Sequence, residues 1–277
     1  MISVVINTLN EAQNIADCIE SVKGLADEIL VCDMKSDDAT QDIARSLGAR
    51  VVEHERTGFV EPARRYAIEQ ASMDWVFVLD ADERMTPPLA KRLRELAQRT
   101  DLDVVRVWSL YWYFGGWVRH GGFFNDQWPR FFRKQVYLDS FRPEEQRVHG
   151  NFGALMHHDN LLILGPEHYI LHLAYPTVEH YVDKTVRKYA HIEAQQYVAD
   201  GGNFKFHRML YDPFRSFVGR YFFKGGFRDG VRGLVLATLF AAYRFCFWAM
   251  VWYERDRDRQ DDRLRIELAK LSEGRGR

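Results

Sequence analysis

The sequence predicts an α/β fold, in which a mainly parallel sheet flanked by helices is followed by a helical, aromatic C-terminal extension. Strand and helix patterns alternate over residues 1–100, as in sheets whose parallel strands are joined by right-handed helical crossovers. A Val-rich apolar run at residues 75–79 indicates a buried strand, and it ends in two acids spaced by one residue. Residues 233–253 are apolar and rich in aromatic side chains, which indicates buried or membrane-facing helix.

The expected elements follow in order from the N-terminus. Apolar runs predict strands at residues 2–6, 28–32, 49–53 and 75–79. Helices are expected from Asn14 to Val22, from Asp38 to Leu47 and from Pro62 to Ala71. A further helix after Pro87-Pro88 is expected to pass through Leu96 and carry the chain to Asp101. Asn and Asp side chains cap the first N–H groups of a helix, and Gly48 favours a helix end. Beyond Asp101, residues 104–108 and 110–114 are typical of strands.

Composition narrows the function classes. The 277 residues carry a formal net charge of -1, so no overall basic field indicates a nucleic-acid partner. The three cysteines, Cys18, Cys32 and Cys246, are too far apart in sequence to suggest a disulfide framework or a paired metal motif. Cys18 and Cys32 fall within apolar patterns and are expected to be buried thiols. Met1 leads directly into a strand pattern, which leaves no room for a signal peptide, so we expect a cytoplasmic protein.

The C-terminal extension has two interpretations. Residues 233–243 are apolar all round, Arg244 interrupts them, and residues 245–253 continue the pattern. Neither half reaches the roughly 20 residues that span a bilayer. Arg232 and Arg244 suit a helix lying at the surface of a membrane, whereas a core helix or a dimer contact is an equal alternative. The charged tail from residue 254 is expected to form a solvated helix that frays at Gly274.

Polar residues follow the predicted strands at the points where they end. Residues 7–11, 33–38 and 80–82 should meet at one edge, because parallel strands present their carboxyl ends together. There Asp33 can accept from a base N–H or a ribose hydroxyl, and Asp80 can reach the ribose or a metal-bound water. Asp82 can bind a hard divalent cation directly, and the cation can bind a diphosphate. The alternative is that Asp80 and Asp82 only begin a loop and cap the next helix.

These segments resemble the successive motifs of glycosyltransferase family 2, whose members have the GT-A (Rossmann-like) fold and transfer sugars from nucleotide-sugars with inversion. The resemblance covers residues 2–85 and rests on Asn7-Thr8-Leu9-Asn10-Glu11 with Asn14-Ile15, on Asp33 to Thr40, and on Leu79-Asp80-Ala81-Asp82-Glu83. Residues 117–126, 130–133, 148–149 and 172–175 resemble the branch that includes lipopolysaccharide-core β-glucosyltransferases.

The resemblance implies three regions and a set of roles. Residues 1–100 would bind the nucleotide-sugar, 101–175 the acceptor, and 176–277 would form the helical extension, for which membrane association is one of the two interpretations above. The implied nucleotide-sugar contacts are Thr8, Asn10, Glu11, Asp33, Asp38, Arg64, Asp80 and Arg130. Asp82 would ligate Mg²⁺ or Mn²⁺. His149 is our candidate for a further metal ligand or a diphosphate contact and His172 is its rival, whereas a histidine can also satisfy hydrogen bonds in a core without any metal. Arg64 and Arg130 have a simpler alternative, as a surface arginine and a structural ion pair respectively.

An inverting transfer also needs a general base for the acceptor hydroxyl. Asp126 is our candidate, because it lies in the Gly- and aromatic-rich segment that resembles the family's acceptor loop, and Glu144 and Glu145 are rivals. Two positions depart from the family pattern. Met34-Lys35 stands where Ser-Gly is frequent, and Gly150 stands where Val148-His149 is often followed by Glu.

The expected reaction is transfer of a hexose from a UDP-sugar to a surface glycan or lipid-linked saccharide at the inner face of the cytoplasmic membrane. A metal-dependent nucleotidyltransferase is one alternative, but residues 10–13 lack the Gly-rich, basic loop that it would carry. A haloacid-dehalogenase-like phosphatase would have its paired acids on the first strand. A non-catalytic membrane-surface scaffold is the third alternative, and clustered carboxylates without partners would be costly in it.

Overall fold

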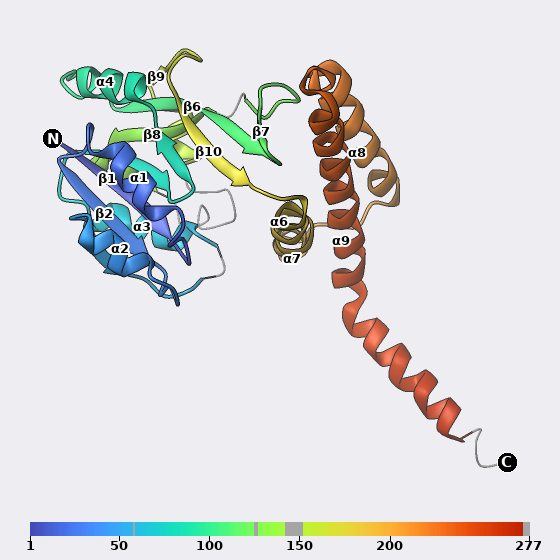
Figure 1. Cartoon of the computed structure of the whole chain (residues 1–277). Helices are drawn as coiled ribbons and strands as arrows, with labels where there is room; N and C mark the ends of the chain where they lie inside the picture. Colours follow the sequence, from blue (N-terminus) through green and yellow to red (C-terminus); the bar gives the residue numbers. More distant parts are fainter. Residues whose placement is uncertain (58, 125–126, 142–151, 274–277) are drawn as a thin grey trace. The chain divides into compact units, whose positions relative to one another are not determined.

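The computed structural model describes residues 1–57, 59–124, 127–141 and 152–273. The chain divides into two compact units, Met1–Pro176 and Thr177–Arg277. The first is a mixed sheet covered by helices and the second is helical (Figure 1), so the predicted α/β class with a helical extension is confirmed.

The first four long strands form the parallel part of the sheet. They are β1 (Ile2–Thr8), β2 (Glu28–Asp33), β3 (Arg50–Glu53) and β4 (Trp75–Asp80), and they lie in the order β3-β2-β1-β4. The connecting helices are α1 (Ile15–Val22), α2 (Thr40–Ser46) and α3 (Glu61–Gln70). Each strand and helix lies within about two residues of its predicted position, which confirms the alternating pattern.

The rest of the sheet is mixed. Next to β4 lies the antiparallel strand β8 (Gln127–Arg133), followed by β6 (Val104–Tyr113), β10 (Tyr169–Tyr175) and β5 (Glu83–Met85). The strand character expected for residues 104–108 and 110–114 is confirmed up to Tyr113, and the two runs form the single strand β6, which continues through the buried Ser109. Strands β7 (Gly116–Val118) and β9 (Leu161–Ile163) pair with β6, and the helices of this half are α4 (Pro87–Leu96), α5 (Lys134–Ser140) and the 3₁₀ turn η2 (Ala154–His157).

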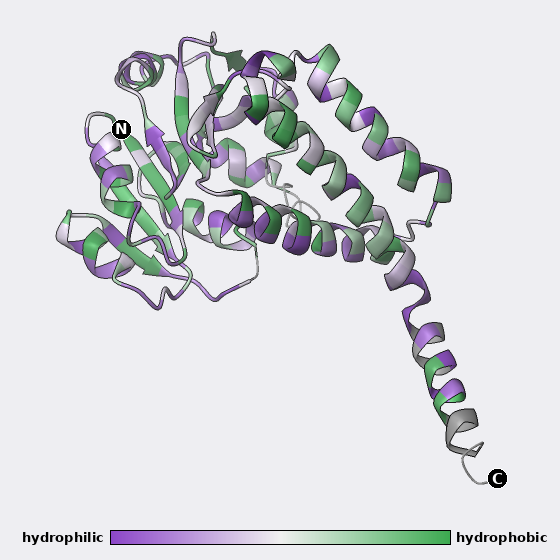
Figure 2. Cartoon of the chain, turned by 45° about the vertical axis from the view of Figure 1, so that its right-hand side comes forward, coloured by the Kyte–Doolittle hydropathy of each residue, from purple (hydrophilic) through white to green (hydrophobic). Residues whose placement is uncertain are grey.

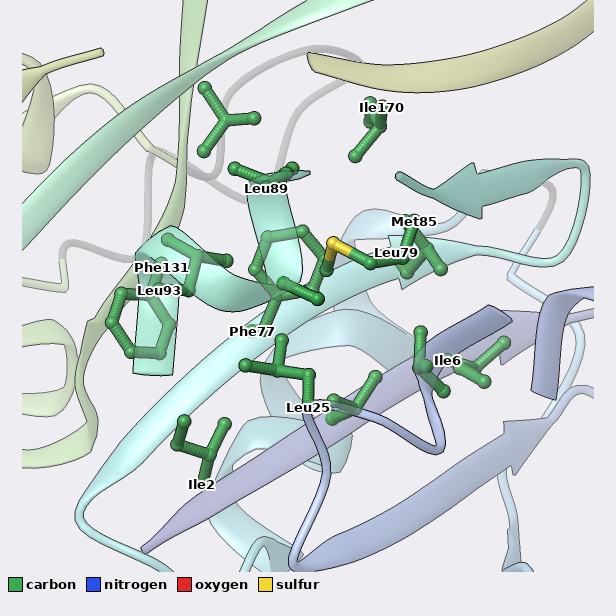
Figure 3. Packing of buried hydrophobic residues seen from close by; sticks show 14 of the residues in the cluster. Ile2, Ile6, Leu25, Phe77, Leu79, Met85, Leu89, Leu93, Phe131 and Ile170 are labelled. Carbon is green, nitrogen blue, oxygen red and sulfur yellow. The ribbon is translucent and has the colours of Figure 1, made fainter. Parts of the chain in front are cut away.

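The core fills both faces of the sheet. On one face Ile2 and Ile6 of β1 pack with Phe77 and Leu79 of β4 beneath α1 and α4 (Figure 3). On the other face α3 covers the alternate residues of the same strands. Burial on both faces explains why these strands are continuous apolar runs, and it confines charged residues to the strand ends.

Cys18 and Cys32 are buried free thiols, as predicted. Burial raises the pKa of Cys32 to about 12, so its thiol stays protonated and acts as a small apolar group.

The C-terminal unit consists of helices. They are α6 (Val178–Tyr181), the π-helical turn η3 (Val182–Tyr189), α7 (Ala190–Ala199), α8 (Phe206–Val218), the π-helical turn η4 (Gly219–Phe223), the 3₁₀ turn η5 (Gly226–Asp229) and α9 (Gly230–Glu273). Helix α9 packs along α7 and α8 through a core that includes Tyr243, Phe247 and Trp248. Hydrophobic residues are concentrated in the first half of α9 and hydrophilic ones in its second half (Figure 2).

The expectation that Arg244 divides the apolar stretch into two short halves was wrong. Helix α9 continues through Arg244, because arginine is a good helix former and its guanidinium reaches Asp212 of α8 at 3.7 Å. Within the described residues, the segment Gly226–Arg257 is long and apolar enough to cross a membrane. Its mean hydropathy is 1.8, and 33% of its most apolar 18-residue stretch is buried. Core helices of soluble proteins meet the same criteria of length and composition.

Candidate active site

The ends of β1, β2 and β4 bring the predicted polar residues to one edge of the sheet. The strand register places Thr8 opposite Asp33 and Asn7 opposite Asp80. Both β1 residues are almost fully buried, and among the described residues no group hydrogen-bonds to the Asn7 amide or to Oγ1 of Thr8. Buried polar atoms are normally hydrogen-bonded, so these atoms are candidates for contact with a ligand. Asn7 was missed as a separate site residue, although it lies in the first motif.

Two loops beyond this edge hold each other in place. Asn10, with a left-handed φ of 57°, donates its N–H to Ser36 Oγ at 2.7 Å and accepts from the Asp37 N–H at 2.8 Å. The N–H of Glu11 donates to Thr40 Oγ1, and a carboxylate oxygen of Asp38 accepts from the Ala12 N–H at 3.1 Å. Asn10 and Asp38 therefore shape the loops that border the site, whatever further contacts they make.

Asp33 ends β2 and is completely buried. Its carboxylate accepts hydrogen bonds from the N–H and the hydroxyl of Ser36, at 2.8 and 2.6 Å, and from the Gln41 amide at 2.7 Å. Lys35 adopts a left-handed φ of 58° and pairs with Glu55, so the departure from Ser-Gly places a cation at the loop surface.

Arg64 of α3 contacts Asp80 at the end of β4. Its Nη2 lies 3.0 Å from Oδ1 and 3.3 Å from Oδ2 of Asp80, and Nη1 of Arg130 lies 4.0 Å from Oδ2. Burial would raise the pKa of Asp80, but the two guanidiniums outweigh it and hold this pKa below its ordinary value. The alternative that Arg64 is only a surface arginine is wrong, because its side chain is only 9% exposed.

Glu83 is the charged residue that the sequence reasoning did not assign. It is fully buried, and its carboxylate accepts from Arg130 Nη2 at 2.7 Å and from the Asp80 N–H at 2.9 Å. His172 Nδ1 lies 3.3 Å from the same carboxylate. Burial raises the pKa of Glu83, while Arg130 and then His172 oppose the rise. The signal in the sequence was that Glu83, a charged residue, lies two positions before Met85 in a strand pattern, so that both side chains are on the same face of the strand.

Asp82 and His172 come together at the junction of β5 and β10. His172 is paired with Glu83 in the antiparallel register, and the Leu173 N–H donates to the Asp82 carbonyl at 2.8 Å. As a result Nε2 of His172 lies 3.4 Å from Oδ2 of Asp82. These residues fit a divalent cation, because neighbouring ligands of an octahedral Mg²⁺ or Mn²⁺ ion lie roughly 3 Å apart. The described residues contain no group of three or more His, Cys, Asp and Glu that could hold an ion. Phosphate and water oxygens would therefore have to complete a site at Asp82 and His172.

The premise that the clustered carboxylates lack partners was wrong. Asp33 is hydrogen-bonded within its own loop, Asp80 is paired with Arg64, and Asp82 lies beside His172. Because these partners stabilise the charges without a ligand, the cost of unpaired acids does not exclude a non-catalytic scaffold.

Four predicted residues lie outside the described part of the chain. They are the candidate base Asp126 with its rivals Glu144 and Glu145, and the candidate ligand His149. Their roles stay predictions. Of the two histidines considered for the metal, His172 lies beside Asp82.

Comparison with known proteins identifies the family. The family model described as Glycosyl transferase family 2 matches residues 3–157, more than half of the chain. The chain belongs to this family. It is therefore a glycosyltransferase.

Curated relatives resemble the enzyme over most of their length. An uncharacterised glycosyltransferase of Rickettsia conorii is 27% identical over 253 residues, which cover 88% of this chain and 87% of the relative. The lipopolysaccharide core biosynthesis glycosyltransferase LpsC of Rhizobium meliloti is 27% identical over 266 residues, which cover 91% and 92%.

Solved structures share the fold of this glycosyltransferase. The glucosyl-3-phosphoglycerate synthase of Mycobacterium tuberculosis, in complex with Mn²⁺, UDP and glucosyl-3-phosphoglycerate, has a TM-score of 0.52 at 20% identity, covering 73% of this chain and 81% of that one. Residues 1–349 of S. aureus TarS, in complex with UDP, give 0.51 at 16% identity, covering 92% and 91%. The GT-A fold expected from the resemblance is confirmed.

Proposed function

We propose that the enzyme transfers a hexose, with inversion, from a UDP-sugar to a saccharide of the cell envelope. The observation that carries this proposal is the arrangement at the end of β4, where two buried arginines and the Asp82–His172 pair surround one edge of the sheet. Carboxylate, imidazole and guanidinium groups together provide what a diphosphate leaving group requires, namely a cation site and hydrogen-bond donors.

The nucleoside half of the donor would bind between the loops after β1 and β2. Thr8, Glu11 and Asp33 are the proposed contacts, with Asn7 added on the basis of its buried amide. Two structures with the same fold were solved with UDP, which supports uridine as the base. Asp80 would accept from the ribose, since its carboxylate is still 29% exposed beside Arg64.

The proposed cofactor is Mg²⁺ or Mn²⁺, bound by Asp82 and His172, with His149 as a further candidate. When bound, the ion would neutralise charge on the diphosphate. The chain itself contributes the charge and position of the surrounding groups. Arg130 is held by Glu83 and Arg64 by Asp80, and these two guanidiniums would lie close to the departing phosphate.

The transfer step would form a bond between an acceptor oxygen and the anomeric carbon while the bond from that carbon to the diphosphate oxygen breaks. The electron pair of the broken bond leaves with UDP. Asp126 is the proposed base that takes the proton of the acceptor hydroxyl, on the strength of its place in the acceptor-side motif. Inversion follows because attack and departure occur on opposite faces of the sugar.

The proposed acceptor is a growing surface glycan or lipid-linked saccharide. The LpsC relative, named for lipopolysaccharide core biosynthesis, supports this class. We propose that the enzyme is cytoplasmic and peripheral on the inner face of the cytoplasmic membrane, where lipid-linked acceptors would be within its reach.

Calorimetric titration with UDP, GDP and ADP, each with and without Mn²⁺, tests the donor and metal assignments together. We expect UDP to bind most tightly, and only with metal. An equally tight response to GDP would overturn the uridine assignment, and metal-independent UDP binding would overturn the role of Asp82. Binding of none of the three would favour a scaffold that has kept the fold.

A further inference from the structure

Helix α8 exposes its apolar residues instead of burying them. Phe206, Leu210 and Phe214 are 64%, 56% and 67% exposed, and they recur every four residues along one side of the helix. Tyr211 of the same helix is also exposed, and so are Phe222, Phe223 and Phe227 of η4 and η5, which follow α8 in the chain. These seven residues, Phe206, Leu210, Tyr211, Phe214, Phe222, Phe223 and Phe227, are called here the aromatic face.

The inner side of α8 is anchored by polar contacts. Asp212 is buried and accepts a hydrogen bond from Trp248 Nε1 of α9 at 2.9 Å. Met209 packs in the core that α9 forms with α7. Helix α8 thus has a fixed orientation within its unit, and its exposed residues Phe206, Leu210 and Phe214 lie on the side opposite to Asp212 and Met209. Water-soluble helices normally show the opposite arrangement, with polar residues on the outside.

Basic residues are enriched in the segment that carries the aromatic face. Residues 205–232 contain seven Lys and Arg against two Asp, whereas the rest of the chain has 31 basic and 37 acidic residues. Five of the seven are exposed, namely Lys205, Arg208, Arg215, Lys224 and Arg228. Asp212, one of the two acids, is buried. Positive charge is therefore concentrated in the same segment as the exposed aromatic residues, in a chain that is otherwise acidic.

This combination matches the surface of an anionic bilayer. Aromatic side chains are favoured at the level of the lipid headgroups, and each nearby Lys or Arg is attracted to anionic lipid. A second copy of the chain fits less well, because a symmetric contact would bring the same basic residues of both copies together.

We propose that the aromatic face docks on an anionic phospholipid bilayer. Its phenylalanines would enter the headgroup region, and the five exposed basic residues would contact phosphate groups. This inference rests on the peripheral location proposed above and adds the docking element and the lipid chemistry.

Flotation of the full-length protein with vesicles tests the inference. The probes are phosphatidylcholine vesicles with and without roughly 30% phosphatidylglycerol, at about 0.05 and 0.5 M NaCl. We expect binding to the anionic vesicles that weakens at high salt, and little binding to the neutral ones. The variant Phe214→Ser/Phe223→Ser should bind at least about tenfold more weakly, since each exposed ring loses its burial in lipid.

Matched variants separate the face from general surface effects. Arg215→Gln/Lys224→Gln should weaken binding to anionic vesicles by roughly tenfold and reduce its salt dependence. Leu264→Ser, at an exposed apolar residue outside the face, and Arg187→Gln, at an exposed arginine on η3, should bind as the unchanged protein does.

Several results would overturn the inference. The unchanged protein would fail to bind vesicles, or it would bind neutral vesicles equally well and keep doing so at high salt. Full binding by the double variant Phe214→Ser/Phe223→Ser would also overturn it. A dimer that Phe214→Ser/Phe223→Ser dissociates would assign the face to self-association instead. Extraction only by detergent would indicate that α9 spans the bilayer. UDP binding is measured in parallel, so loss of the donor site is distinguished from loss of docking.

Discussion

Replacing Glu83 with glutamine tests whether this buried carboxylate positions the site. The substitution keeps the size of the side chain and removes its charge next to Arg130, whose Nη2 lies 2.7 Å away. Removing one partner of a buried ion pair costs about 3 to 5 kcal/mol. Asp80 lies 4.0 Å from the other nitrogen of Arg130 and keeps one carboxylate close, so we expect the lower end, about 3 kcal/mol.

The same substitution should affect metal binding separately from stability. Glu83 lies 3.3 Å from Nδ1 of His172, and a carboxylate at this nitrogen orients the ring so that Nε2 faces Asp82. Loss of such an outer partner typically lowers metal affinity by about 10- to 100-fold. Urea denaturation measures the stability, and Mn²⁺ titration in the presence of UDP measures the affinity.

The control is Glu95→Gln, because Glu95 forms an exposed pair with Arg92 and should change neither quantity. A Glu83→Gln protein with reduced stability and unchanged Mn²⁺ affinity would refute the positioning role. A variant as stable as the unchanged protein would show that Glu83 is already protonated at neutral pH, and the ion-pair reasoning would fail.

Three further predictions concern the site and the sheet. Asp82→Asn should abolish metal-dependent turnover and leave the urea midpoint unchanged; turnover that persists would remove the metal assignment. Arg64→Met should destabilise the fold by about 2 kcal/mol and raise the pKa of Asp80, because this partly exposed carboxylate loses its main partner; a titration of Asp80 followed by NMR checks the direction. Burial opposes ionisation of Glu28, but hydrogen bonds from Ser3, Ser72 and Arg50 outweigh it and lower the pKa of Glu28 to about 2. The ionised carboxylate therefore contributes about 3 kcal/mol to the free energy of unfolding above pH 4.5, and this contribution is lost as the pH falls towards 2. Denaturation curves of Glu28→Gln should therefore lack about 1 kcal/mol of the stability change between pH 7 and pH 4, and an unaltered pH dependence would contradict this assignment.

Much of the first unit follows from local patterns. The runs that form β1, β2 and β4 are apolar because they are buried on both faces, and such runs are visible in the sequence. Their polar ends had to meet, because parallel strands end at the same edge. Asp33, Asp80 and Asp82 could therefore be placed near one another without any knowledge of their contacts.

The partners of these acids could not be predicted in the same way. Arg64 belongs to a helix whose rotation about its axis decides whether the side chain meets Asp80 or solvent. The place of His172 beside Asp82 depends on which strand pairs with β5, and that pairing is set by the register of β10. The prediction that Arg244 divides the apolar stretch into two short halves was wrong for a similar reason, because Asp212 on another helix pairs with its charge.

The sequence by itself determined the alternation of strands and helices, the edge at which the acids gather and the family to which the chain belongs. These features depend on residues close together in the chain or on a fixed rule of parallel sheets. The tertiary structure decided that Glu83 holds both Arg130 and His172, and that α8 turns its aromatic side outwards. Such contacts join segments far apart in sequence, and their geometry depends on packing that no local pattern specifies.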